Sequence, residues 1–132
     1  MDSVKKVYDF LENAGNFYLA TTEGDQPRVR IYGDMLYFED RIYIMAFNQT
    51  NATKQIAVNP KAEICTFKGQ TLRISCKLVK DDRQVVKDAM MAKMPALKPI
   101  TGENGENAVM YYLSDATATF FKLMEPVETL TF

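Results

Sequence analysis

The fold of this chain is decided by the stretch FYLATTEGDQPRVRIYGDMLYFEDRIYIMAFNQTNATKQIAVNPKAEICTFKGQTLRISCKL, residues 17–78. Period-two patterning, clearest along residues 28–38, and short polar turns are typical of antiparallel strands. The pattern predicts strands over 17–22, 28–38, 41–47, 62–67 and 71–79. Residues 52–58 are expected to form a short helix, with Thr50 or Asn51 as its N-cap. Gly33 indicates a bulge or a close backbone approach in the second strand.

Helices are predicted on both sides of this stretch. Near the N-terminus the apolar residues recur at helical spacing, at Val4, Val7, Tyr8 and Leu11, and Gly15 suits the end of that helix. After the fifth strand, Asp81 or Asp82 is expected to cap another helix. The apolar stripe of this second helix is Val85, Val86, Ala89 and Met90.

The C-terminal third is expected to return to strands. Residues 94–107 contain two prolines and two glycines and predict an irregular loop. Residues 108–113 and 116–123 are predicted to be strands joined at Ser114–Asp115, and the tail 125–132 either finishes a strand or packs on a neighbour. The fold class is therefore mainly β, a β-barrel with helical additions, with an open α+β sheet as the alternative. The 132 residues are expected to form one domain, 1–132.

Composition narrows the class of protein. Sixteen basic residues nearly balance seventeen acidic ones, which argues against a binder of nucleic acid or of membrane surfaces. No apolar run is long enough for a transmembrane helix, and the first fifteen residues do not resemble a signal peptide. We therefore expect a cytoplasmic protein, in which Cys65 and Cys76 are reduced, although a disulfide between facing strands is an alternative.

The residues that are missing exclude several kinds of chemistry. The chain has no histidine, which excludes histidine acid–base catalysis and histidine-ligated zinc. Two cysteines cannot complete a four-ligand zinc site, so no metal site is expected. The common glycine-rich enzyme motifs are also missing. Any chemistry is therefore expected to come from a bound cofactor, and no catalytic side chain can be named.

Three groups of residues are candidates for ligand binding. Arg28 and Arg30 share one face of the second strand, and arginines there can bind a phosphate or a carbonyl-bearing ring; the plain alternative, which periodicity alone favours, is a solvated face. Residues 50–55 open a helix with hydroxyls and a lysine, which suits a phosphate; the plain alternative is an N-cap beside a surface lysine. Arg73, on the fifth strand, is the third candidate.

Three motifs in this order resemble the pyridoxamine 5'-phosphate oxidase-like, FMN-binding split-barrel family. They are YLATTEGDQPRVR at 18–30, KQIAVNPKAEI at 54–64 and LRIS at 72–75. The chain is most similar to the small single-domain branch that includes the nitroimidazole-resistance-type proteins, and the resemblance covers nearly its whole length. It implies a six-stranded antiparallel split barrel, a homodimer, and FMN at the subunit interface. The implied activity is a flavin-dependent oxidoreductase acting on a small molecule.

Matched motif positions imply which residues contact the cofactor. Residues on the second and third strands would contact the flavin ring and ribityl chain. Residues at the helix start would bind the phosphate. Residues on the fifth strand would approach the site from the partner subunit or form part of its wall. They are Arg30, Ile31, Tyr32, Met45, Ala46, Thr50, Asn51, Lys54, Gln55, Thr71 and Arg73.

The chain also departs from the family pattern. Cys76 stands where glycine is common, and the phosphate segment carries a single lysine, Lys54. The arginine-rich C-terminal segment of true pyridoxamine phosphate oxidases is missing, so oxidation of vitamin B6 is not expected. Two alternatives stay open: a barrel that binds FMN, haem or a deazaflavin without turnover, and a dimer that has lost its cofactor.

Overall fold

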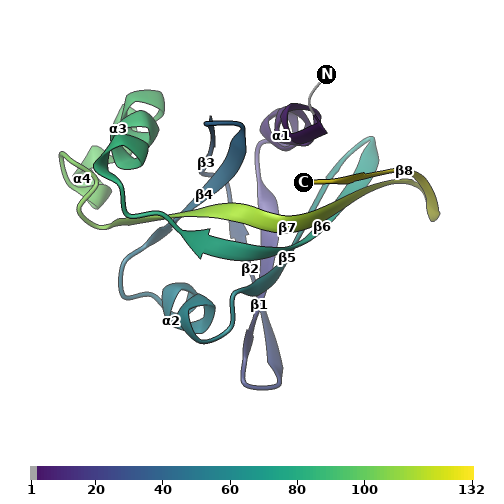
Figure 1. Cartoon of the computed structure of the whole chain (residues 1–132), viewed down its shortest axis with the longest axis horizontal. Helices are drawn as coiled ribbons and strands as arrows, with labels where there is room; N and C mark the ends of the chain where they lie inside the picture. The colour runs from purple at the N-terminus through teal and green to yellow at the C-terminus, as the bar shows by residue number, and fades with distance from the viewer. Residues whose placement is uncertain (1–2) are drawn as a thin grey trace.

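The computed structural model describes residues 3–132 and shows an antiparallel sheet with helices around it (Figure 1). The strands are β1 (Phe17–Glu23), β2 (Gln26–Tyr32), β3 (Met35–Phe38), β4 (Arg41–Phe47), β5 (Lys61–Lys68), β6 (Gln70–Lys80), β7 (Ala108–Lys122) and β8 (Glu125–Thr131). The helices are α1 (Ser3–Ala14), α2 (Asn51–Val58), α3 (Gln84–Lys93) and α4 (Lys98–Thr101), with a 3-10 turn, η1, at Pro95–Leu97. The mainly β class with helical additions is confirmed.

The order of the strands requires the sheet to curl. Neighbours follow the order β2-β1-β5-β6-β7-β4-β3, and β8 pairs with β7. In a flat sheet the outermost strands of this order would lie about 29 Å apart, at about 4.8 Å per strand. Only Gly33 and Asp34 join β2 to β3, and such a link spans at most about 11 Å. The two ends therefore meet, and because residues 3–132 form no ladder between β2 and β3, the barrel is split there.

The inside of the barrel is filled by the apolar residues of alternating strand positions. Fully buried examples are Phe17, Leu19, Ile42, Ile44, Ile64, Leu72 and Ile74. Helix α1 covers this core with Val7 and Leu11, which are also fully buried. A second apolar cluster lies under α3, on the other side of β4 and β7; it includes Leu36, Tyr43, Met45, Val86, Met90 and Met110. None of the helices within residues 3–132 has the length and apolar character needed to cross a membrane.

The predicted strand 28–38 is two strands in the structure. The break falls at Gly33–Asp34, where the chain passes from one end of the sheet to the other. A Cβ atom on Gly33 would lie 3.4 Å from the carbonyl oxygen of Gly15, so the close backbone approach predicted there is confirmed. The extra strand contributes to a total of eight within residues 3–132, where the family resemblance implied six.

The C-terminal third is more regular than predicted. The segment 94–107, expected to be a loop, contains η1 and α4. The two predicted strands are one continuous strand, β7, and the tail forms β8 against it. Sequence reasoning broke β7 at Ser114–Asp115, where the ladder with β6 is irregular and Asp115 has a φ of 48°.

The expected aspartate cap of α3 is wrong. The helix begins at Gln84, and its N-cap residue, Arg83, makes no side-chain cap hydrogen bond. Asp81 instead accepts hydrogen bonds from Arg83 and from the Tyr43 hydroxyl at 2.7 Å. The carboxylate thus joins the end of β6 to β4 through Tyr43 and contacts Arg83, but it does not cap the first turn of α3.

Candidate functional site

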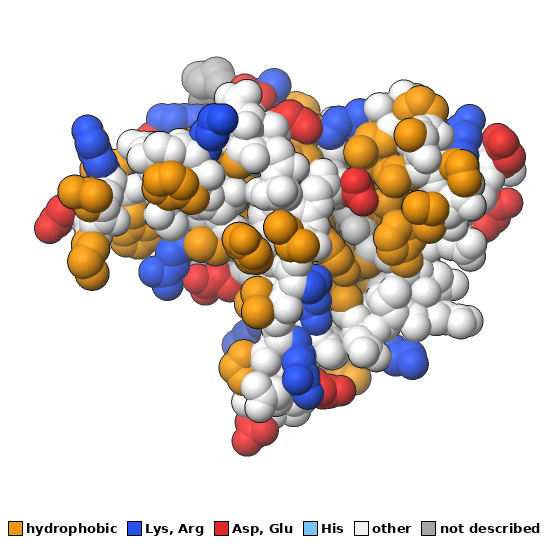
Figure 2. Space-filling view, turned by 180° about the vertical axis from the view of Figure 1, so that it is seen from behind, with side chains coloured by type: hydrophobic (Ala, Val, Ile, Leu, Met, Phe, Trp, Pro, Cys, Tyr) orange, Lys and Arg blue, Asp and Glu red, His pale blue; other side chains and the backbone are white. Residues whose placement is uncertain are grey.

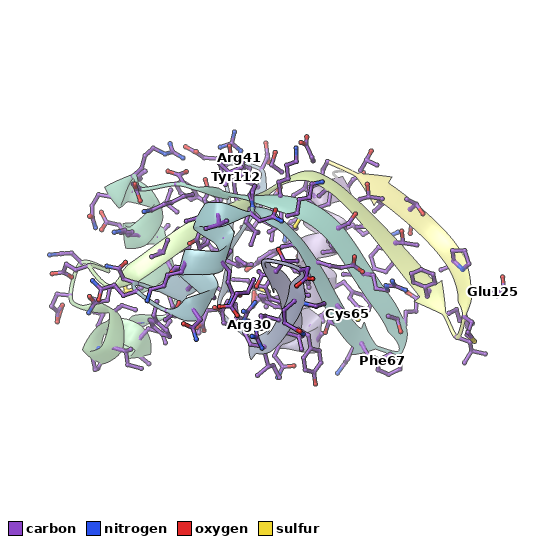
Figure 3. All side chains as sticks on the ribbon, turned by 90° about the horizontal axis from the view of Figure 1, so that it is seen from below. Arg30, Arg41, Cys65, Phe67, Tyr112 and Glu125 are labelled. Atoms are coloured by element: carbon purple, nitrogen blue, oxygen red, sulfur yellow. The ribbon has the colours of Figure 1, made fainter. Side chains whose placement is uncertain are left out.

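A hollow of about 510 Å³ opens between β2 and the start of α2. Because side chains alternate along a strand, Arg28, Arg30 and Tyr32 all face it. The full lining is Glu23, Arg28, Val29, Arg30, Tyr32, Thr50, Asn51, Ala52 and Gln55. Figure 3 shows Arg30 close to α2, whereas Arg41 and Tyr112 lie together in another part of the molecule. We call this space the β2–α2 hollow.

The start of α2 is fixed by Thr50. Its backbone is extended, and its Oγ1 accepts a hydrogen bond from the Thr53 amide at 3.3 Å, so Thr50 and not Asn51 is the N-cap. The same hydroxyl donates to the Phe47 carbonyl at 2.9 Å, which anchors the cap to the end of β4. The first amides of an α-helix have no partner within the helix and carry partial positive charge. Thr50, Asn51 and Ala52 line the hollow, so this end of α2 faces it.

Arg30 is held rigidly at the floor of the hollow. Its Nη1 donates to the Thr21 hydroxyl at 2.7 Å and to the Leu19 carbonyl at 3.2 Å. Its Nη2 donates to Gln55 Oε1 at 2.8 Å, and that oxygen also accepts the Thr21 hydroxyl at 2.6 Å. Thr21 and Gln55 are both buried. The guanidinium therefore joins β1, β2 and α2 and is preorganised as a positive charge.

Arg28 is held differently. Its Nε and Nη2 both donate to one carboxylate oxygen of Glu23, at 3.0 and 2.8 Å. Both side chains are about half exposed, near the turn end of the β1–β2 hairpin. On the face seen in Figure 2, basic side chains follow this hairpin at the bottom of the molecule, and acidic side chains lie near its tip. Because this ion pair is exposed, Arg28 can exchange Glu23 for another acceptor.

Tyr32 closes the inner end of the hollow. Its ring packs edge-on against Phe17, with the centroids 6.2 Å apart. Burial raises the pKa of its hydroxyl, although the nearby Arg30 charge opposes the shift. Tyr32 is therefore a neutral phenol at physiological pH, able to donate a hydrogen bond.

The structure gathers five of the eleven predicted contact residues around this hollow. They are Arg30, Tyr32, Thr50, Asn51 and Gln55. Lys54 lines an adjacent hollow of about 440 Å³, between α2 and the β1–β2 turn, which shares Glu23, Asn51 and Gln55 with the first. We call this second space the α2–turn hollow.

The remaining predicted residues lie elsewhere in this chain. The side chains of Met45 and Ala46 are buried in the two apolar clusters and line neither hollow. Ile31 is 54% exposed and points to the outer face of the sheet. Thr71 and Arg73 lie on β6, where Arg73 pairs with Glu63 at 3.3 Å.

The outer face of the sheet is unusually apolar. The register aligns Ile31, Tyr18, Cys65 and Arg73 in one row across β2, β1, β5 and β6. Its exposed large apolar residues include Tyr18, Val29, Ile31 and Phe67. Leu123 and Met124, at the β7–β8 turn, are about nine-tenths exposed. Apolar side chains are visible from the β8 end toward the β1–β2 hairpin in Figure 2.

A third space, of about 450 Å³, is lined mainly by residues of β1, β5 and β6, with Pro27 and Asp115, and by none of the eleven predicted contacts. Cys76 belongs to its wall and is 6% exposed. Burial raises the pKa of this thiol to about 12, with a smaller effect from Glu63. The β6–β7 register shifts between Ser75 and Lys77, so Cys76 lies at a bulge. Both cysteines are free thiols.

Sequence reasoning missed Thr21 and Glu23 as parts of the site. Thr21 was predicted near the end of the strand 17–22 and Glu23 in the turn after it, and neither has an unusual sequence signal. The register of the hairpin, which pairs Thr21 with Arg28, would have brought them to the arginines.

No protein-family model matches the chain, and no curated protein matches it either. Solved structures do match. A NimC/NimA family protein from Clostridium acetobutylicum shares 34% identity over 100% of this chain and 95% of its own, with a TM-score of 0.91. A pyridoxamine 5'-phosphate oxidase-related, FMN-binding protein from Nostoc punctiforme shares 15% identity over 100% and 97%, with a TM-score of 0.68. An FAD-binding protein from Mesorhizobium loti shares 12% over 88% and 93%, with a TM-score of 0.65.

Proposed function

Because the chain belongs to the NimC/NimA family, we propose that it is a homodimeric flavoprotein that binds FMN and carries out oxidation or reduction of a small molecule. Two of the structurally similar proteins are described as FMN-binding and FAD-binding, which supports a flavin as the ligand. The observation that carries the proposal is the β2–α2 hollow, where a fixed arginine faces a helix start. A cytoplasmic location is part of the same proposal.

The residues of the hollow fit the phosphate of FMN. A phosphate needs several donors and positive charge, and helix starts and arginines supply both. Here Thr50 and Asn51 stand at the helix start, and Arg28 and Arg30 stand opposite on β2. Lys54 lies in the adjoining hollow, beyond Gln55. These residues would hold the phosphate, and the space of about 510 Å³ lies within the usual range for ligand sites.

The outer face of the sheet is the surface that we assign to the second copy of the chain. The strand that carries Arg30 also presents Val29 and Ile31 outward, at 68% and 54% exposure. A contiguous exposed apolar surface of this kind marks an interface. A copy seated on it would cover the edge strand β2 and bring its own Thr71 and Arg73 toward this site, where the family resemblance places them.

Bound FMN supplies hydride transfer through its ring. The chain's own residues would bind and orient the flavin and would exclude water from it. Arg30 presents a charge whose position is fixed by Thr21, Gln55 and the Leu19 carbonyl, so it needs no rearrangement when an anionic or carbonyl group arrives. Tyr32 contributes a neutral hydroxyl. We assign no side chain as a catalytic acid or base.

The decisive measurement is binding. The purified protein should release a yellow flavin on heating, or should titrate with FMN at micromolar concentration. FMN should bind at least about tenfold more tightly than riboflavin, because riboflavin lacks the phosphate that the hollow would hold. Arg30→Met should remove this preference, whereas the control Arg41→Met, which loses an arginine stacked on Tyr112, should keep it.

Turnover and assembly complete the test. Reduction of the bound flavin by NADH or NADPH, with transfer to an acceptor, would establish an oxidoreductase; binding without reduction would favour a cofactor carrier on the same fold. A protein that binds no flavin would support the alternative of a barrel that has lost its cofactor. Sedimentation should show a dimer, and a charge at Ile31 (Ile31→Glu) should dissociate it.

A further inference from the structure

We propose that Glu23 competes with the phosphate group for Arg28 and so sets how strongly the hollow prefers phosphorylated ligands. The inference rests on the proposed function, since it concerns the same site. Its basis is the contrast between two arginines that line one hollow, one locked by buried partners and one held by an exposed carboxylate.

Arg30 cannot exchange its present hydrogen-bond partners for a ligand. Three acceptors hold its two terminal nitrogens, and two of these acceptors, Thr21 and Gln55, are themselves buried and bonded to each other. Moving the guanidinium would break three hydrogen bonds, two of them to buried side chains, which is unfavourable. Arg30 therefore offers the same donors whether or not a ligand is present.

Arg28, in contrast, can exchange its partner for a ligand. Its side chain is 50% exposed, and its Glu23 partner is 57% exposed. Exposed ion pairs of this kind contribute little to stability and break readily. A phosphate entering the hollow would be a doubly charged acceptor for the same nitrogens, in the bidentate geometry that arginine favours. To bind it, Arg28 would have to leave Glu23.

Glu23 is also well placed to repel the ligand it competes with. Within residues 3–132 it is the single acidic side chain that lines either the β2–α2 hollow or the α2–turn hollow, and it lines both. It thus lies between Arg28 on one side and the space lined by Lys54 on the other. Neutralising it would release Arg28 and make both hollows more positive.

The test uses the full chain and two ligands that differ only in the phosphate. FMN and riboflavin are titrated against wild type, Glu23→Gln, Arg28→Gln and the double variant, with the quenching of flavin fluorescence as the readout. Glu23→Gln should tighten FMN binding about threefold to fivefold, in line with an exposed ion pair, and leave riboflavin unchanged. The gain should shrink in 1 M salt, which screens exposed charges.

Two comparisons show whether the effect passes through Arg28. In the Arg28→Gln background, Glu23→Gln should give no gain. The matched control is Glu39→Gln, which removes a carboxylate of similar exposure that pairs with Arg83 at 2.6 Å and lines neither hollow. It should leave both affinities unchanged. Far-UV circular dichroism confirms that each variant is folded.

Each result decides the matter. An unchanged FMN affinity in Glu23→Gln, or an equal gain for riboflavin, overturns the competition while the proposed function stands. A gain that persists without Arg28 also overturns it, since the carboxylate would then act by direct repulsion alone. If neither wild type nor Glu23→Gln binds any flavin, the proposed function fails and the inference fails with it. Binding by Glu23→Gln alone would support the competition.

Discussion

Replacing Gln55 with methionine is expected to lower the free energy of unfolding by roughly 2–3 kcal/mol. The side chain is 7% exposed, and its single oxygen accepts hydrogen bonds from Arg30 at 2.8 Å and from Thr21 at 2.6 Å. A hydrogen bond to a charged group contributes about 1.5–3 kcal/mol and a neutral one about 1 kcal/mol. Arg30 keeps its other acceptors and is half-buried, so water offsets part of the loss. Methionine fills a similar volume, so no large cavity is added.

Urea unfolding of the flavin-free protein, at one fixed protein concentration, measures the loss as a shift of the midpoint with an unchanged slope. The matched control is Lys54→Met, at the exposed position just before, which should change stability by no more than about 0.5 kcal/mol. Gln55→Glu keeps an acceptor beside Arg30 and should stay near wild type. If Gln55→Met loses no more than Lys54→Met, the network does not hold β1, β2 and α2 together, and the rigid placement of Arg30 is refuted.

Two other predictions concern groups outside the hollow. Hydrogen bonds from Arg83, and then from Tyr43, lower the pKa of Asp81 from 3.8 to about 2, so its stabilisation is complete above pH 4 or so and is lost as the pH falls toward 2. Between pH 5 and pH 2, wild type should therefore lose roughly 1–2 kcal/mol more than Asp81→Asn in urea unfolding, and equal losses would contradict this. In Cys65→Ser, Cys76 is the one remaining thiol. Because this thiol is buried and has a pKa of about 12, the folded variant should react with a disulfide reagent at pH 8 on the order of a hundredfold more slowly than the urea-unfolded variant. Fast labelling of the folded variant would show that the thiol is accessible.

The strands that the sequence predicted well are those with local signals. β1, β4, β5 and β6 lie within about two residues of their predicted bounds, because apolar alternation and the turns that flank it are properties of neighbouring residues. The division between β2 and β3 has no such signal. It follows from closure of the barrel, which carries the chain from one end of the sheet to the other through Gly33 and Asp34.

The second group of errors involves side chains whose partners are distant in sequence. Asp81 looks like a helix cap, because aspartate before an apolar stripe is a common start signal. In the structure its carboxylate accepts hydrogen bonds from Arg83 and from Tyr43, and Tyr43 lies 38 residues away on a strand that the topology brings beside it. A local pattern cannot show that a better hydrogen-bond donor will be present, so the cap prediction failed for a tertiary reason.

In the candidate site too, the residues with local sequence signals could be predicted, and the contacts that depend on tertiary structure could not. Alternation along β2 and the polar start of α2 predicted two separate candidate groups, and the family resemblance predicted that Arg30, Tyr32, Thr50 and Asn51 would serve one site. In the structure these four residues line one hollow. What fixes Arg30 could not be predicted, because its contacts with Thr21 and Gln55 depend on the hairpin register and on how α2 packs against β1.

Arg30 is fixed by buried partners and Arg28 is not, and this difference determines how the two arginines can act together. A locked cation binds an anion without reorganising, but it cannot distinguish among anions that fit the same space. A cation held by an exposed carboxylate responds to the strength of the incoming charge, since only a stronger acceptor than Glu23 displaces it. A site with both, as on β2, combines a fixed anchor with a charge-sensitive contact. Binding of the flavin phosphate would then require Arg30, whereas Arg28 and Glu23 would set how large the preference for the phosphorylated form is.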